Sequence, residues 1–151
     1  MKVEVDFSAI KEKINYALNN TYTRRAINNE FARMCNPYVP MKEGVLSQSV
    51  RVLDDGLYYP GPYAHYMYIG QIYGPNFPII QDGMIVGWRS PKGKGSKHPT
   101  GRPIHYSTER HPLASKEWDK AMMRDKGEEF ANTVGLLLMR SIHKWQIKIK
   151  P

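Results

Sequence analysis

Apolar positions recur at helical spacing in the first part of the chain. The first stripe consists of Ile10, Ile14, Ala17, Leu18 and Thr21. A second stripe follows at the same period and consists of Ile27, Phe31 and Met34. The two stripes together predict a long N-terminal helix with one face toward the core.

Particular residues mark the ends of this helix and a break inside it. Asp6 or Ser8 can cap its start, because a side-chain oxygen accepts hydrogen bonds from the free N–H groups of the first turn. Asn19-Asn20 is expected to mark a kink or break between the stripes, since Asn has poor propensity for helix interiors. Pro37 and Pro40 end the helix.

Shorter patterns follow and predict a hairpin and a short helix. Residues 45–53 are expected to form a helical turn and then a strand. Asp54-Asp55-Gly56 is a turn signal between apolar runs, so 57–59 is the expected returning strand. Residues 63–69 are expected to form a short helix that ends at Gly70.

The region 71–112 has the least regular pattern. It contains one clear strand candidate, over 84–88. The segment 90–103 is rich in Gly, Pro and Lys and has no apolar period, so it cannot bury enough apolar surface to order itself. We therefore predict a flexible basic loop over 89–105, and a loop this long in a compact domain is typically functional.

The last part of the chain predicts a second long helix and a tail. The helix is expected to start near Ala114-Ser115 and to break near Gly127. Its apolar face consists of Trp118, Ala121, Met122, Phe130, Val134, Leu137, Leu138 and Ile142. Beyond it, Trp145, Ile147 and Ile149 alternate with polar residues. This alternation predicts an extended tail over 143–151 that adds a strand to this sheet or to a neighbouring subunit's sheet. Disorder of the chain end is the alternative.

These elements predict an α+β fold in a single domain over residues 1–151. The fold consists of a long N-terminal helix, a small antiparallel sheet with a long basic loop, and a C-terminal helix packed on that sheet. No internal repeat and no linker divides the chain.

Composition narrows the setting in which the protein works. The single Cys35 excludes an intrachain disulfide and fits synthesis in a reducing cytoplasm. No apolar run approaches the length of a membrane-spanning helix, and the charged N-terminus lacks the apolar core of a signal peptide. We therefore expect no membrane partner. Ten Tyr and three Trp suit protein interfaces, although they can equally fill a small core.

The formal net charge of +8 is partly local. Between residues 89 and 111, six basic residues face one acidic residue, Glu109, for a net +5. The candidate contact residues in this stretch are Arg89, Lys92, Lys94, Lys97 and Arg102. A dense basic loop can meet a phosphate backbone or an acidic protein surface, and solubility is the bland alternative.

The sequence lacks a catalytic constellation. His98, His105 and His111 share the basic region, but neighbouring Lys and Arg would repel a divalent cation there. Cys35 falls at a helix end, which disfavours a thiolate, so it is expected to be an inert packing residue. Asp54-Asp55 and Glu128-Glu129 are adjacent pairs whose side chains diverge. We therefore expect no metal, no cofactor and no enzymatic activity.

An ordered series of motifs lies between Phe31 and Ala121. It begins with Tyr38-Val39-Pro40, followed by Gly44 and Leu46, and continues with Tyr63-Ala64, followed by Tyr66 and Gly70. These motifs resemble the minor capsid and tail-completion proteins of long-tailed bacteriophages. In that family a "YVP…G.L..S" segment leads into a strand and then into "YA.Y.Y.G". Two later segments, 83–91 and 99–106, and the start of the last helix are also similar to the family. The matching positions are Tyr38, Pro40, Gly44, Leu46, Tyr63, Ala64, Tyr66, Gly70, Pro112, Ala114 and Trp118.

The resemblance implies a non-catalytic virion protein that assembles as a ring at the head–tail joint. Its implied partners are copies of itself, neighbouring neck, head-connector and tail proteins, and packaged DNA in the ring lumen. On this view Tyr63 and Tyr66 fix the short helix on the sheet, and Gly70 permits the following turn. The basic loop is the expected contact element.

Two rival hypotheses remain at the level of sequence. A free nucleic-acid-binding protein agrees with the net charge, but no recognised binding motif supports it. A nuclease would need an acidic metal cluster that the sequence does not offer.

Overall fold

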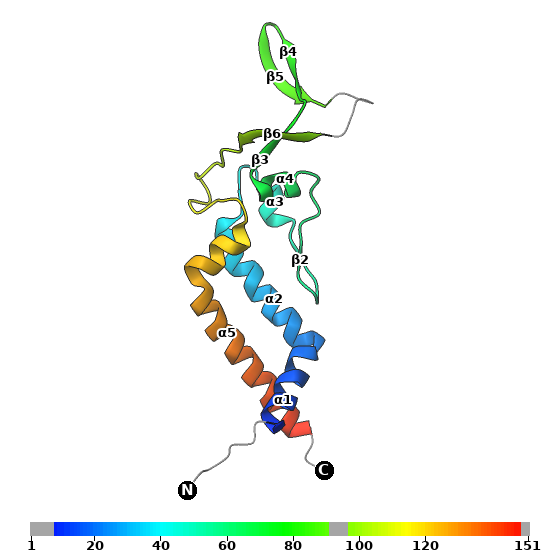
Figure 1. Cartoon of the computed structure of the whole chain (residues 1–151), viewed down its shortest axis with the longest axis vertical. Helices are drawn as coiled ribbons and strands as arrows, with labels where there is room; N and C mark the ends of the chain where they lie inside the picture. Colours follow the sequence, from blue (N-terminus) through cyan, green and yellow to red (C-terminus); the bar gives the residue numbers. More distant parts are fainter. Residues whose placement is uncertain (1–7, 91–96, 149–151) are drawn as a thin grey trace.

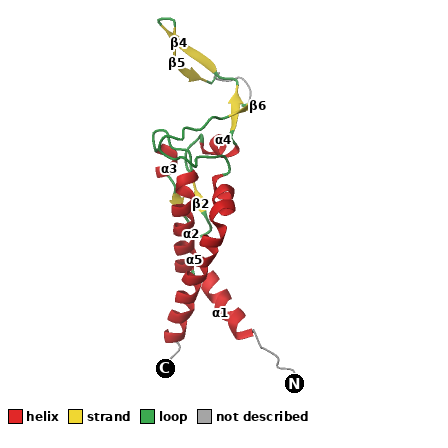
Figure 2. Cartoon of the chain, turned by 90° about the vertical axis from the view of Figure 1, so that its left-hand side faces the viewer, coloured by secondary structure: helices red, strands yellow, loops and turns green. Residues whose placement is uncertain are grey.

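Two long helices lie side by side and form the body of the molecule. A β-hairpin extends from one end of the molecule, and the described part of the chain begins and ends at the other (Figures 1 and 2). In this computed structural model, which describes residues 8–90 and 97–148, α2 (Thr21–Cys35) packs along α5 (Trp118–Lys148). The helix α1 (Ser8–Asn19) contacts both at the foot of the body (Figures 1 and 2). The α+β class expected from the sequence is confirmed. The main partner of α5 is α2, whereas the sequence predicted packing on a sheet.

The expected break in the N-terminal helix lies at Asn20. This residue has extended backbone angles (φ −74°, ψ 116°), and its side chain accepts from the N–H groups of Tyr22 (2.9 Å) and Thr23 (3.3 Å). Asn20 therefore caps α2 and makes two helices of the predicted one. At the other end of the pattern, Ser8 is the first residue of α1, and Asp6 lies outside the described residues.

A series of short elements follows α2 in the chain. A 3₁₀ turn, η1 (Asn36–Tyr38), follows α2, and α3 (Val45–Gln48) follows Gly44. The strands β1 (Arg51–Val52) and β2 (Leu57–Tyr58) pair antiparallel around the Asp-Gly turn, as predicted.

The short helix α4 (Ala64–Ile69) also agrees with the prediction. It ends at Gly70 in the left-handed conformation (φ 76°), whose N–H donates to the carbonyl of Tyr66.

The region expected to be irregular contains four strands. The strand β3 (Gln71–Gly74) pairs with β6 (His98–Pro103), and β4 (Phe77–Gln81) pairs with β5 (Met84–Arg89), both antiparallel. Only the strand corresponding to β5 was predicted. The strands missed by the prediction contain Pro78, Pro99 and Pro103, and two-stranded ribbons tolerate Pro because their outer edges need no N–H donor.

The predicted flexible loop over 89–105 is therefore wrong at both ends. Arg89 closes β5, and His98–Pro103 forms β6 because pairing with β3 satisfies its backbone. Lys92 and Lys94 lie outside the described residues.

The closing helix also differs from its prediction at both ends. It begins at Trp118, after Glu117 with a positive φ of 46°. The predicted break near Gly127 is present one residue earlier, at Lys126 (φ −133°, ψ 18°). The predicted extended tail is wrong over 143–148, because α5 continues to Lys148. Extending an existing helix costs less than starting a new element, which overrides a short alternating pattern. Residues 149–151 lie outside the described part.

Candidate functional site

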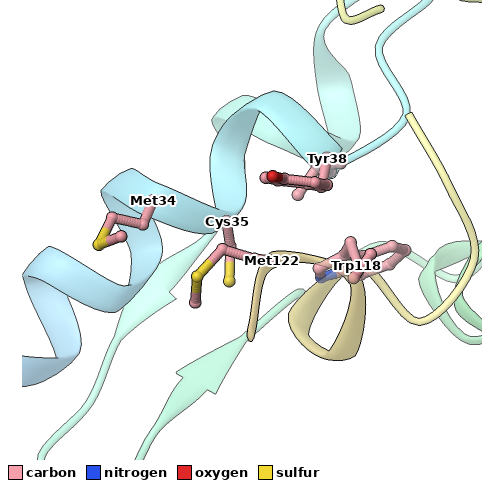
Figure 3. Close-up of a cluster of buried hydrophobic side chains, with 7 residues drawn as sticks. Met34, Cys35, Tyr38, Trp118 and Met122 are labelled. Atoms are coloured by element: carbon pink, nitrogen blue, oxygen red, sulfur yellow. The ribbon is translucent and has the colours of Figure 1, made fainter. Parts of the chain in front are cut away.

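The motif residues gather where the body meets the strands, in a region that we call the hub. Seven buried apolar side chains form its core, from the end of α2, η1 and the start of α5 (Figure 3). They are Met34, Cys35, Tyr38, Val39, Trp118, Ala121 and Met122. Leu46, another motif residue, packs against this cluster from α3.

Trp118 joins the helices to the neighbouring short elements. Its ring lies 5.2 Å from Tyr59, after β2, and 5.0 Å from Tyr68 of α4, with both pairs edge to face. The hydroxyl of Tyr68 donates to the carboxylate of Asp119 at 2.8 Å. Edge-to-face pairs add roughly 0.5–1.5 kcal/mol beyond burial, so Trp118 fixes β2 and α4 on the body.

Backbone hydrogen bonds fasten the segment 104–117 across the hub. The N–H of Ser115 donates to the carbonyl of Tyr38 (3.0 Å), and that of Glu117 donates to the carbonyl of Tyr68 (2.9 Å). The N–H of Ile104 donates to the carbonyl of Gly70 (2.9 Å). These bonds tie three distant parts of the sequence together without using side-chain identity.

Two side chains complete this fastening. The hydroxyl of Tyr106 donates to the carbonyl of Met67 at 2.7 Å, and Nδ1 of His111 lies 2.7 Å from the carbonyl oxygen of Val39. His111 therefore has a structural position in the hub, which differs from the metal-binding role weighed for it.

Gly70 is required where the segment 104–117 crosses α4. A β-carbon at this position would lie 2.9 Å from Cβ of Lys116 and 2.9 Å from the hydroxyl oxygen of Tyr106. Both the positive φ and this close approach exclude other residues.

The remaining motif residues divide between the hub and the surface. Pro40 and Ala64 are buried, and Tyr66 of α4 contacts Tyr73 of β3 with ring centroids 4.7 Å apart. Tyr66 thus holds α4 on a strand, as expected. Tyr63 does not take the expected packing position, because it is 68% exposed. Ala114 is half-buried in a turn with His111, and Pro112 is exposed.

Burial in the hub disfavours ionisation of three groups. Burial raises the pKa of Cys35 to about 12 and, together with nearby negative charge, raises the pKa of Tyr59 to about 12. Burial and the hydrogen bond to Asp119 also raise the pKa of Tyr68 to about 12. A thiol in this state is a packing group and a poor nucleophile, as predicted for Cys35.

A second region, which we call the arm, consists of the hairpin β4–β5, residues 77–89. Asp82 (φ 51°) and Gly83 (φ 78°) form its two-residue turn. Seven large apolar side chains of the arm are between 40% and 68% exposed. They are Phe77, Ile79, Ile80, Met84, Ile85, Val86 and Trp88. Apolar patches larger than a few hundred Å² mark interaction sites, so the arm is the candidate interface.

Of the candidate basic contact residues, the structure describes Arg89, Lys97 and Arg102, and these lie near the base of the arm. Arg89 ends β5 and Arg102 belongs to β6, and both are exposed, whereas Lys97 is half-buried just before β6. The sequence pointed to these charges as the contact element and missed the apolar arm beside them.

Across 8–90 and 97–148 there is no group of three His, Cys, Asp or Glu side chains placed to hold a metal ion. Within the same ranges, no helix is long and apolar enough to cross a membrane.

Comparison with models of protein families gives a match over most of the chain. A family model described as minor capsid protein matches residues 1–134 of the 151-residue chain. No curated protein and no solved structure matches this chain.

Proposed function

Because the chain belongs to the minor capsid protein family of bacteriophages, we propose that it forms a ring in the phage neck, where it completes the tail or joins the tail to the head. As a member of this family it is a structural protein of the virion that interacts with other virion proteins. Its proposed place of synthesis is the host cytoplasm. The proposed neighbours are copies of itself and the neck, head-connector and tail proteins. The proposed role is association without turnover.

The apolar arm is the observation that carries this proposal. A protein that acts alone rarely leaves seven large apolar side chains exposed on one hairpin, whereas a subunit of an assembly covers them with a neighbour. The hub supplies the complementary property, because its buried core and the hydrogen bond from Ile104 N–H to the Gly70 carbonyl hold the start of β3 and the end of β6, the strands between which the arm extends.

Electron microscopy of lysates from a phage lacking this gene tests the proposal. We expect separate DNA-filled heads and finished tails, and restored virions when the gene is supplied from a plasmid. Normal virions without the gene would contradict the proposed role.

Contact with packaged DNA is a second candidate function, favoured by the exposed Arg89 and Arg102 at the base of the arm. Reversing the charge of the five candidate contact residues, Arg89, Lys92, Lys94, Lys97 and Arg102, should then reduce DNA retention while leaving particles assembled. A free DNA-binding protein would differ by a steep salt dependence of the purified chain on DNA. Unchanged retention in the charge-reversed phage would remove this candidate.

A further inference from the structure

The arm is apolar on both of its faces. The strand register pairs Pro78 with Trp88 and Ile80 with Ile85, so these four residues share one face. On the other face, Phe77 lies opposite Arg89 and Ile79 lies opposite Gly87. Both faces expose large side chains, so a single flat contact would leave half of the arm in water.

The size and charge of the arm restrict what can cover it. Its seven exposed apolar side chains approach the roughly 800 Å² that each partner contributes to a standard protein interface. The only charged residue between Phe77 and Trp88 is Asp82. A nearly neutral, apolar arm does not match a polyanion, so its partner has an apolar surface.

The body carries a groove of matching chemistry. It has a volume of about 540 Å³ and lies between α2, β2, α4 and the start of α5. Phe31, Leu57, Tyr59, Tyr68 and Trp118 form most of its lining, and Asn28, His65 and Asp119 supply its polar groups.

The arm cannot fill this groove within one copy. Both views place the arm beyond β3 and β6, at the end of the molecule away from the helices that line the groove (Figures 1 and 2). A contact between arm and groove must therefore join two copies. Because the arm and the groove are different surfaces, the contact is head to tail, and repeating it produces a ring or a helical filament.

We propose that the arm of one copy inserts into the groove between α2, β2 and α4 of the next copy. This inference rests on the proposed ring function and names the two surfaces that make the ring. The groove covers the face of the arm that carries Ile80 and Ile85.

Cross-linking between two cysteine variants of the full chain tests the proposed contact. Ile80→Cys places a thiol on the arm, and His65→Cys places one at the exposed groove position. Both are made in a Cys35→Ala background, because Cys35 also lines the groove. Under mild oxidation at high protein concentration, we expect a disulfide-linked dimer when the two variants are mixed. Neither variant alone should give it. Mixing Ile80→Cys with Met139→Cys, which is exposed on α5, is the matched control and should give no such dimer.

Sedimentation of charge variants gives an independent measurement. Ile80→Glu should weaken self-association at least about tenfold, because it places a charge in an apolar contact. Gln81→Glu adds the same charge at a polar position next to the turn and should have a much smaller effect.

Three results would overturn the inference. The first is self-association without the cross-link between Ile80→Cys and His65→Cys, and the second is a chain that stays monomeric at all concentrations. The third is binding of the chain to neutral phosphatidylcholine vesicles that Ile80→Glu abolishes, which would assign the arm to lipid. Each of these results leaves the deletion-phage test intact, so failure of the contact and failure of the neck role are distinguishable.

Discussion

Trp118 and Trp88 show how differently the two regions of this molecule use the same side chain. Trp118 is 4% exposed and contacts two tyrosines from separate elements, whereas Trp88 is 64% exposed on a ribbon of two strands. The apolar side chains of the hub are buried and stabilise the fold, whereas those of the arm are exposed to solvent. The apolar residues of the arm can therefore be changed with little effect on stability. Tyr59, Tyr68 and Trp118, in contrast, both stabilise the hub and line the groove.

The largest difference in the free energy of unfolding is expected between the variants that remove each of these two tryptophans. Trp118→Ala should lower the free energy of unfolding by roughly 3–5 kcal/mol, because it empties a buried site in contact with Tyr59 and Tyr68. Trp88→Ala should change it by less than about 0.5 kcal/mol, since the side chain packs on little of its own chain. Urea denaturation followed by circular dichroism measures both. Equal losses would mean that the arm also contributes to the core.

Alkaline pH should destabilise the hub and leave the arm as it is. The native pKa values of Cys35, Tyr59 and Tyr68 are raised to about 12 from ordinary values of 9.0 for the thiol and 10.0 for the phenols. A raised native pKa means that the protonated group stabilises the fold. This stability is complete below pH 9.0 and is lost progressively as the pH rises to about 12.

The urea midpoint measured across that range provides the test. Tyr59→Phe removes one of the three groups and should make the decline between pH 10.0 and about 12 shallower. A midpoint that does not fall in this range would show that these groups are not buried in solution.

Two glycines with similar φ angles allow the stability cost of a steric clash to be distinguished from the cost of backbone strain. Gly70 (φ 76°) lies under Lys116 and Tyr106, whereas Gly83 (φ 78°) at the tip of the arm has no atom within 4 Å of an added β-carbon. Gly83→Ala should cost about 1–2 kcal/mol, because it adds only left-handed strain. Gly70→Ala adds a steric clash and should cost clearly more. Thermal unfolding of both variants measures the difference, and equal values would place the segment 104–117 farther from α4.

The smallest expected effect concerns the start of α2. Asn20→Ala removes the cap that accepts from Tyr22 and Thr23, and it should cost about 1 kcal/mol. Asn19→Ala, at the last residue of α1, is the neighbouring control and should be close to neutral. Urea denaturation compares the two. A similar loss for both variants would mean that propensity rather than capping sets the boundary.

The sequence pattern predicted the body better than the strands. Helical periodicity located α2 and most of α5, because each has one buried face, and Asn19-Asn20 marked the break at Asn20. The strand β4 was missed because alternation between apolar and polar positions arises when only one face of a strand is buried. In the arm both faces are apolar. The pair Asp82-Gly83 between apolar runs is a hairpin signal that could have located it.

The candidate site was predictable only where side-chain identity determines the contact. Of the motif residues, Tyr38 and Trp118 lie in the buried cluster of the hub, and Gly70 lies against Lys116 and Tyr106 of the segment 104–117. The bonds that join them run between backbone groups such as Ser115 N–H and the Tyr38 carbonyl, and no side-chain pattern encodes these. Local positive charge led to the prediction that Arg89 and Arg102 are contact residues. The neighbouring segment 77–88, with seven large apolar residues and a single charge, is the stronger indication of an interface.

The order of elements along the chain sets a sequence of events during synthesis on the ribosome. The core of the hub needs the start of α5, whereas the arm precedes α5 in the chain and emerges first. At roughly 5–20 residues per second, the apolar arm is outside the ribosome for on the order of seconds before its base is fixed. During that interval the nascent chain presents an apolar β-ribbon with open edges, which is the kind of segment that nascent-chain chaperones shield from aggregation.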